Sequence, residues 1–159
     1  MGVNDSTGNT DSVTADSMRL TLPAAASAAP ALRDALRELC VNNAVDAPVV
    51  DEVVLAAQEA CNNAFLHSET ADGTIEVNAV VADRQIRVEV KDQGRGLDTG
   101  EVSVAAPPDP LDAHGRGLFI IDSLMDSLEI IPCCPGTLVR MTKAIHARPA
   151  ISLPARRAG

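Results

Sequence analysis

The chain has 159 residues, a length that suits one domain and leaves little for a second. Hydrophobic residues make up 46% of it but aromatic residues only 1%, so the core must be aliphatic and few rings are present on which nucleic-acid bases could stack. The formal net charge of −9 disfavours binding to nucleic-acid backbones.

Both ends of the chain are polar or irregular in composition. Residues 1–16 are rich in Ser, Thr, Asn, Asp and Gly, which predicts a disordered tail. Residues 147–159, rich in Pro, Ala and Arg, predict a flexible tail, which leaves one domain over 17–146. No basic start with an apolar run and no membrane-length apolar stretch occurs, so we expect a cytoplasmic protein.

The first half of the domain reads as one strand and two helices. Met18–Leu22 alternates polar and apolar residues, as a strand does, and Pro30–Val45 has the spacing of an amphipathic helix. After the break at Asp46–Pro48, a second helix is expected over Val49–His67. Its apolar residues, Phe65 included, form one broad face, while Leu55 and Leu66 lie opposite. We therefore expect this helix to be central and largely covered.

The second half reads as two hairpins separated by a loop and a helix. Thr74–Ala82 and Gln85–Val90 alternate strictly around Asp83-Arg84 and predict the first hairpin. A loop over 98–114 and a helix over Leu118–Met125 follow, and the second hairpin pairs Ser127–Ile131 with Thr137–Thr142. The order β-α-α-β-β-loop-α-β-β indicates an α+β two-layer sandwich, with a mixed, mostly antiparallel sheet covered on one face by helices. It excludes a doubly wound sheet.

The four cysteines include no CxxC pair. Cys40 and Cys61 fall within apolar helical patterns, where a thiol behaves as a small hydrophobe. Vicinal Cys133-Cys134 could be redox-active or bind a soft metal, although no further ligand lies at the usual spacing.

A polar stripe runs along the second helix. Glu59, Asn63 and His67 are spaced four residues apart and share one side. A solvated helix face would explain them, but a polar stripe on a covered helix needs partners or a ligand. A carboxylate one turn from a carboxamide can place a general base beside a hard cation such as Mg²⁺.

Three glycine-containing segments follow the stripe. Asp92-Gln-Gly94-Arg-Gly96 ends a strand, Gly115-Arg-Gly117 precedes a helix, where free N–H groups favour phosphate, and Gly136-Thr137 begins the last strand. Each alone is explained equally well by a tight turn. An α+β scaffold unrelated to nucleotides therefore stays open as a reading of the separate motifs.

In their order and separation, these segments resemble the sequence boxes of the GHKL (Bergerat-fold) ATPases. Glu59-Ala-Cys-Asn-Asn63-Ala64 resembles the N box, and the three glycine segments resemble the glycine boxes. The segment Gly115–Met125 is typical of the branch of anti-sigma-factor serine/threonine kinases. The resemblance covers about residues 17–143.

The resemblance implies a role for each matching residue. Asn63 would hold Mg²⁺, Glu59 would be the general base, and Asp92 would accept a hydrogen bond from the adenine amino group. Gly94 and Gly96 would let the chain fold beneath the base, and Thr137 would help hold the adenine end. Phosphates would be bound by the second glycine box, with its residues Gly115, Arg116, Gly117 and Leu118. Residues 98–114 would form a lid over ATP.

The family also implies partners. The chain would be a protein kinase that phosphorylates a STAS-type anti-sigma-factor antagonist and sequesters a sigma factor, as a homodimer without nucleic acid or membrane. In one respect it departs from the pattern: kinase members carry an Arg in the lid before the second glycine box, whereas Asp112, Ala113 and His114 precede Gly115 here. Arg116 is the candidate substitute. The alternative is an ATP-dependent protein-binding switch with little or no kinase activity.

Overall fold

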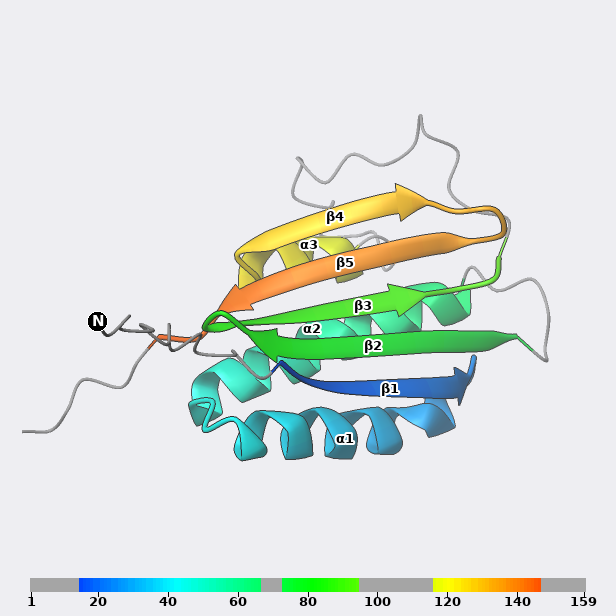
Figure 1. Cartoon of the computed structure of the whole chain (residues 1–159). Helices are drawn as coiled ribbons and strands as arrows, with labels where there is room; N and C mark the ends of the chain where they lie inside the picture. The colour runs from blue at the N-terminus through cyan, green and yellow to red at the C-terminus, as the bar shows by residue number, and fades with distance from the viewer. Residues whose placement is uncertain (1–14, 67–72, 95–115, 147–159) are drawn as a thin grey trace, which may run out of the picture.

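A computed structural model describes residues 15–66, 73–94 and 116–146. They form five strands, three α-helices and a short 3₁₀ helix (Figure 1). In chain order these are β1 (Asp16–Pro23), η1 (Ala26–Ala28), α1 (Ala29–Asn42), α2 (Ala47–Leu66), β2 (Thr74–Ala82), β3 (Gln85–Lys91), α3 (Arg116–Leu124), β4 (Ser127–Pro132) and β5 (Thr137–Ala144).

The strands form one sheet in the order β1-β2-β3-β5-β4. All four pairings among the described strands are antiparallel, so the predicted α+β class is confirmed and the sheet contains no parallel pair in this part of the chain. Asp83 and Arg84 join β2 to β3 with φ of 50° and 58°. Positive φ at both central residues is the geometry that matches the twist of a two-residue hairpin.

The helices cover one face of the sheet, and they lie behind it in Figure 1. Strands β2 and β3 alternate buried and partly exposed residues along their length, with the buried ones facing the helices. The core is aliphatic, as expected, and its largest fully buried side chains include Leu32, Leu36, Ile86, Ile121 and Met141.

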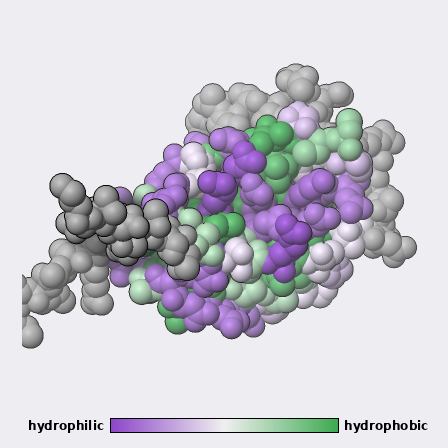
Figure 2. Space-filling view, viewed as in Figure 1, coloured by the Kyte–Doolittle hydropathy of each residue, from purple (hydrophilic) through white to green (hydrophobic). Residues whose placement is uncertain are grey.

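The opposite face of the sheet is open and largely polar (Figure 2). Arg140 of β5 lies in register between Glu89 of β3 and Glu129 of β4, and its guanidinium donates to them at 2.8 and 3.1 Å. These hydrogen bonds, first to Glu89 and then to Glu129, raise the pKa of Arg140. The register of three neighbouring strands is thus matched by opposite charges on their open face.

Helix α1 ends three residues earlier than the pattern predicted. Asn43 donates from its backbone N–H and from its side-chain Nδ2 to the carbonyl of Leu39, and Ala44 then adopts φ of 52°. A left-handed residue after this cap stops the helix. Val45 is nevertheless buried, because the chain turns back onto the core.

The expectation that α2 is largely covered was wrong. Its side toward the sheet is buried, but Leu55, Phe65 and Leu66 are 43%, 45% and 64% exposed. Helices α1 and α3 contact α2 from its two flanks and leave its outer side open. The presence of apolar residues on two sides of this helix therefore does not mean that both sides are buried.

Truncation of single side chains on α1 tests which face of this helix is buried. Leu36→Ala should lower the free energy of unfolding by about 2–5 kcal/mol, because it removes a side chain with no exposure and leaves a cavity. Val41→Ala on the same helix is the matched control, since Val41 is 70% exposed and should change stability by about 0.5 kcal/mol or less. Urea unfolding measures both, and equal losses in the two variants would contradict this packing.

Candidate functional site

Asn63 of α2 and Gly117 of α3 meet where the two helices pack together. Gly117 is buried, and a Cβ added to it would lie 2.7 Å from Oδ1 and 2.8 Å from Nδ2 of Asn63. Only glycine therefore lets the start of α3 approach the carboxamide this closely. The Nδ2 atom is buried and has no hydrogen-bond partner among the described residues. A buried donor without an acceptor is costly, which points to a ligand that supplies one.

The other end of α3 is held against α2 by Lys143 of β5. Its Nζ donates to the carbonyl of Leu124 at 2.6 Å and forms an ion pair with Glu52 of α2 at 2.8 Å. A cation at the last carbonyls of a helix is also favoured by the helix dipole. Lys143 thus fixes α3 at the end opposite to the contact between Gly117 and Asn63.

Glu59 lies one turn before Asn63 on α2 and is partly exposed. Within the described parts of the chain, its carboxylate forms no ion pair and no hydrogen bond. Its position beside Asn63 and its lack of bonds to the described residues suit a group that acts on a ligand rather than one that stabilises the fold.

Asp92, directly after β3, joins this strand end to the start of β5. Its side-chain Oδ1 accepts hydrogen bonds from the backbone N–H of Gly94 at 2.8 Å and of Thr137 at 3.2 Å. Its own N–H donates to the Thr137 carbonyl at 3.0 Å. Both side-chain bonds use the same oxygen, so in the described structure Oδ2 is left to accept a hydrogen bond from a ligand. Asp92 is 9% exposed and Thr137 is 6% exposed.

Gly136 makes this junction possible. Its φ is 91°, in the region that favours glycine, and an added Cβ would lie 2.0 Å from the backbone oxygen of Asp92. The two strand ends can therefore come together only with glycine at this position. Figure 1 shows that they lie at the same end of the molecule as the C-terminal end of α2, and α2 packs against both β3 and β5.

The structure places most, but not all, of the sequence-predicted site. It brings Asn63 against Gly117, and Asp92 against Gly94 and Thr137. Arg116 is exposed at the first position of α3, and Leu118 packs against the core. Gly96, Gly115, His67 and the lid segment 98–114 lie outside the described residues.

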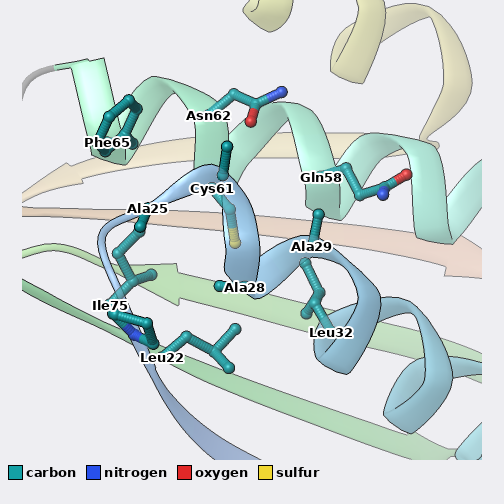
Figure 3. A pocket seen from close by; sticks show the side chains of 12 residues that line it. Leu22, Ala25, Ala28, Ala29, Leu32, Gln58, Cys61, Asn62, Phe65 and Ile75 are labelled. Atoms are coloured by element: carbon teal, nitrogen blue, oxygen red, sulfur yellow. The ribbon is translucent and has the colours of Figure 1, made fainter.

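A pocket on the other flank of α2 is a different feature (Figure 3). It lies between the η1–α1 segment and the second half of α2, and its walls are mostly apolar. Cys61 points its sulfur into it, and Asn62 and Phe65 stand at its rim (Figure 3). Asn63, Glu59 and Asp92 do not line it, so it is separate from the polar site.

The histidine kinase-like ATPase domain family matches residues 22–143 of the chain. The chain belongs to this family. The predicted resemblance of the chain to the GHKL ATPases is thereby confirmed. In the described ranges 15–66, 73–94 and 116–146, no helix is long and apolar enough to cross a membrane.

Several similar proteins carry regulatory names. An anti-sigma F factor from Caldanaerobacter subterraneus subsp. tengcongensis is 33% identical over 111 residues, which are 62% of this chain and 74% of that protein. The anti-sigma F factor of Clostridium acetobutylicum is 33% identical over 86 residues, 51% of this chain and 59% of its own length. The serine-protein kinase RsbW of Bacillus licheniformis is 31% identical over 108 residues, 61% of this chain and 66% of the kinase.

A solved structure supports the same fold. The RsbU and RsbW domains of Rv1364c from Mycobacterium tuberculosis match with a TM-score of 0.65 and 27% sequence identity, over 85% of this chain. The match spans 34% of the mycobacterial chain, so it corresponds to one part of a larger protein.

The polar groups of this ATPase domain fit a magnesium-bound adenine nucleotide. The Asn63 carboxamide offers an oxygen that suits Mg²⁺ and an unpaired donor that suits a phosphate oxygen. Oδ2 of Asp92 can accept from the adenine amino group, whereas guanine presents an oxygen at the equivalent position. The backbone N–H groups of the first turn of a helix, which α3 presents from Arg116 on, favour phosphate.

Two residues that shape the site were not among those predicted for it. Lys143 has a signal in the sequence, because it continues the inward-facing alternation of Val139 and Met141 in β5, where a charge needs partners. Gly136 belongs to the segment that resembles the third glycine box, but the resemblance gives a role to Thr137 and none to Gly136. Its close contact with Asp92 joins two hairpins that are far apart in the sequence, and no local pattern in the sequence indicates it.

Replacement of Gly117 should separate ligand binding from stability. Gly117→Ala should weaken Mg·ATP binding, because the added Cβ displaces the Asn63 carboxamide. The free energy of unfolding should change little, because a gain in helix propensity of at most about 1 kcal/mol offsets the cost of moving the end of the Asn63 side chain. Calorimetric titration and urea unfolding measure the two effects, with exposed Ser123→Ala on the same helix as control. Unchanged affinity in Gly117→Ala would contradict the role given to this contact.

Proposed function

We propose that the chain is an ATP-dependent serine/threonine protein kinase and anti-sigma factor, which acts in the cytoplasm. One observation carries the proposal. The Asn63 carboxamide has a buried donor without a partner in the described structure, and it lies against Gly117, whose missing side chain leaves room for it at the start of α3. The chain that carries this contact belongs to the histidine kinase-like ATPase family. Relatives named anti-sigma F factor and serine-protein kinase RsbW support this choice within the family.

Each polar residue then has a task in phosphoryl transfer, where catalysis is mostly positioning and charge stabilisation. Mg²⁺ held by Asn63 supplies positive charge beside the phosphates. The N–H groups of Arg116, Gly117 and Leu118 at the start of α3, with Gly115, bind phosphate oxygens. Glu59, partly exposed one turn away, accepts the proton of the attacking hydroxyl.

The adenine end lies at the strand junction. Asp92 selects adenine through Oδ2, while its Oδ1 is held by two backbone N–H groups that fix the carboxylate in place. Thr137, in the same network, supports this end of the site, and Gly94 and Gly96 let the chain pass beneath the base. Residues 98–114 close over the nucleotide as a lid and exclude water.

The partners follow from the same assignment. The hydroxyl that receives phosphate belongs to a serine or threonine of a STAS-type anti-sigma-factor antagonist, and the second partner is a sigma factor. A homodimer is the expected form. The clostridial and mycobacterial relatives extend beyond the matched region, so these partners are inferred for the matched domain alone.

A second candidate is an ATP-dependent switch that captures partners with little or no transfer. The observation that favours it is the composition before the second glycine box, where Asp112, Ala113 and His114 stand and no arginine does. Arg116 begins α3 with its side chain exposed, which gives it access to bound phosphate as a substitute. Loss of Arg116 would abolish transfer in the first case and change little in the second.

Nucleotide binding should depend on two residues from opposite ends of the site. At saturating excess, Mg·ATP should raise the free energy of unfolding by about 2–4 kcal/mol in the wild type. Asn63→Ala should lose the dependence on Mg²⁺, and Asp92→Asn should abolish binding of adenine nucleotides. The asparagine keeps the oxygen that accepts from Gly94 and Thr137 but offers a donor to the adenine amino group. Calorimetry of the three proteins decides this, and wild-type protein without binding heat or thermal shift would refute the nucleotide site.

Glu59 should be needed for phosphate transfer but not for Mg·ATP binding. Glu59→Gln should lower the rate of transfer to an antagonist protein by about 10²–10⁴-fold, the usual contribution of a general base. Its affinity for Mg·ATP should remain unchanged, because the residue forms no bond in the described structure. Radiolabelled ATP and a panel of STAS-type antagonists from the same organism measure this. Equal transfer by both proteins would remove Glu59 from the mechanism, and no transfer by the wild type would favour the switch.

A further inference from the structure

The turn between β4 and β5 carries two adjacent free thiols, Cys133 and Cys134. Cys134 is exposed and Cys133 is partly exposed. The Cys133 N–H donates to the carbonyl of Gly136 at 2.8 Å and closes the turn, while the Cys133 thiol faces the carbonyl of Ile131 at 3.7 Å. Neither thiol has a role in the fold comparable to that of a core side chain, and neither is used by the proposed reaction.

The same turn leads directly into the adenine end of the candidate site. Gly136, which closes the turn with Cys133, is the residue whose backbone abuts Asp92, and Thr137 donates to the Asp92 carboxylate. Only two residues, Pro135 and Gly136, separate Cys134 from Thr137, which binds the carboxylate that would read adenine. Gly136 lies so close to Asp92 that an added Cβ would fall 2.0 Å from the Asp92 carbonyl oxygen, so we expect a change in the shape of the turn to shift Asp92 or Thr137.

The other two cysteines are less accessible than Cys133 and Cys134. Cys40 is fully buried in the core, and Cys61 points into the narrow pocket beneath η1 (Figure 3). Burial raises the pKa of the Cys40 thiol to about 11 and that of Cys61 to about 12, so both stay protonated near neutral pH. The thiolate is the reactive form, and these two positions are therefore poor competitors for an electrophile.

We propose that Cys133 and Cys134 form a bidentate capture site for a soft, thiophilic electrophile with two exchangeable positions, of the trivalent arsenical type, and that occupation of this site weakens nucleotide binding. The thiols are on adjacent residues, so once one has reacted the second bond forms within the same molecule at high effective concentration. The second half of the proposal rests on the proposed nucleotide site.

The reaction balances without an oxidant or a reductant. Two S–H bonds break and two As–S bonds form, while the oxygen of an arsenoxide, R–As=O, leaves as water with both thiol protons. Arsenic stays trivalent throughout. A competing dithiol can take the arsenic back by the same exchange, so the capture is reversible.

The test uses the whole chain without nucleotide, with phenylarsine oxide as the probe. Intact mass should show one arsenical per chain, peptide mapping should place it on residues 133–134, and an excess of a monothiol should leave it bound whereas 2,3-dimercaptopropanol should remove it. Cys133→Ser and Cys134→Ser should each lose resistance to the monothiol, while Cys40 and Cys61 remain in every variant as internal controls. No adduct, an adduct on Cys40 or Cys61, or unchanged resistance in either serine variant would overturn the capture site.

The second arm measures coupling to the nucleotide. The adduct should weaken Mg·ATP binding by about tenfold, within the usual range for coupled sites, and Mg·ATP should slow capture. In Cys133→Ser, the reagent and its removal should leave the affinity for Mg·ATP unchanged. Normal Mg·ATP affinity of the adduct would overturn the coupling. If the unmodified protein bound no nucleotide, the proposed nucleotide site would be refuted. The capture site is tested by the first arm alone, whatever the result for nucleotide.

Discussion

The close packing of α2 on the sheet is the constraint on which the remaining structure depends. The face of this helix that meets the sheet is built from small residues, and Ala56, Ala57 and Ala60 have no exposed surface. Small side chains let the helix backbone approach the strands closely. With α2 placed in this way, α1 and α3 pack on its two flanks, and its outer side remains open.

Two contacts at glycine then bring polar groups to the end of this framework. At Gly117 the missing Cβ makes room for the Asn63 carboxamide, and at Gly136 it makes room for the backbone of Asp92. The need for these glycines does not come from a need for flexibility in their own segments. Each is needed because a polar residue from a distant segment occupies the space that a side chain would fill. The site is therefore a set of contacts between elements, held by Lys143 at the far end of α3 and by the Asp92–Thr137 hydrogen bonds at the strand junction.

This arrangement divides the molecule into regions with different chemistry. The flank of α2 toward α3 carries Asn63, while its flank toward α1 carries Cys61 above an apolar pocket. The open face of the sheet holds charges paired across strands, and the hairpin tip beyond Gly136 holds two accessible thiols. The polar groups of the candidate site and the two accessible thiols therefore gather at one end of the fold, where strand and helix ends leave backbone groups to bind a ligand.

The sequence by itself determined the fold class, the element order and the grouping of the four boxes. Strict alternation in β2 and β3 and the periodicity of α1 are local consequences of backbone geometry, so they can be read along the chain. It also indicated Asn63 through the polar stripe on the second helix, whereas Asp92 was indicated by the resemblance of its segment to the first glycine box. It did not determine that Leu55, Phe65 and Leu66 face outward, because periodicity defines the sides of a helix but not what covers them.

Only the tertiary structure decided the contacts between distant segments. The space at Gly117 exists because α3 packs antiparallel to α2, and that at Gly136 exists because β5 pairs with β3. Lys143 finds Glu52 and the end of α3 for the same reason. Such contacts depend on distances across the chain, and a local pattern carries no information about distance. The physical reason is that local geometry fixes which way a side chain points along its own element, whereas packing of the whole core fixes what it meets.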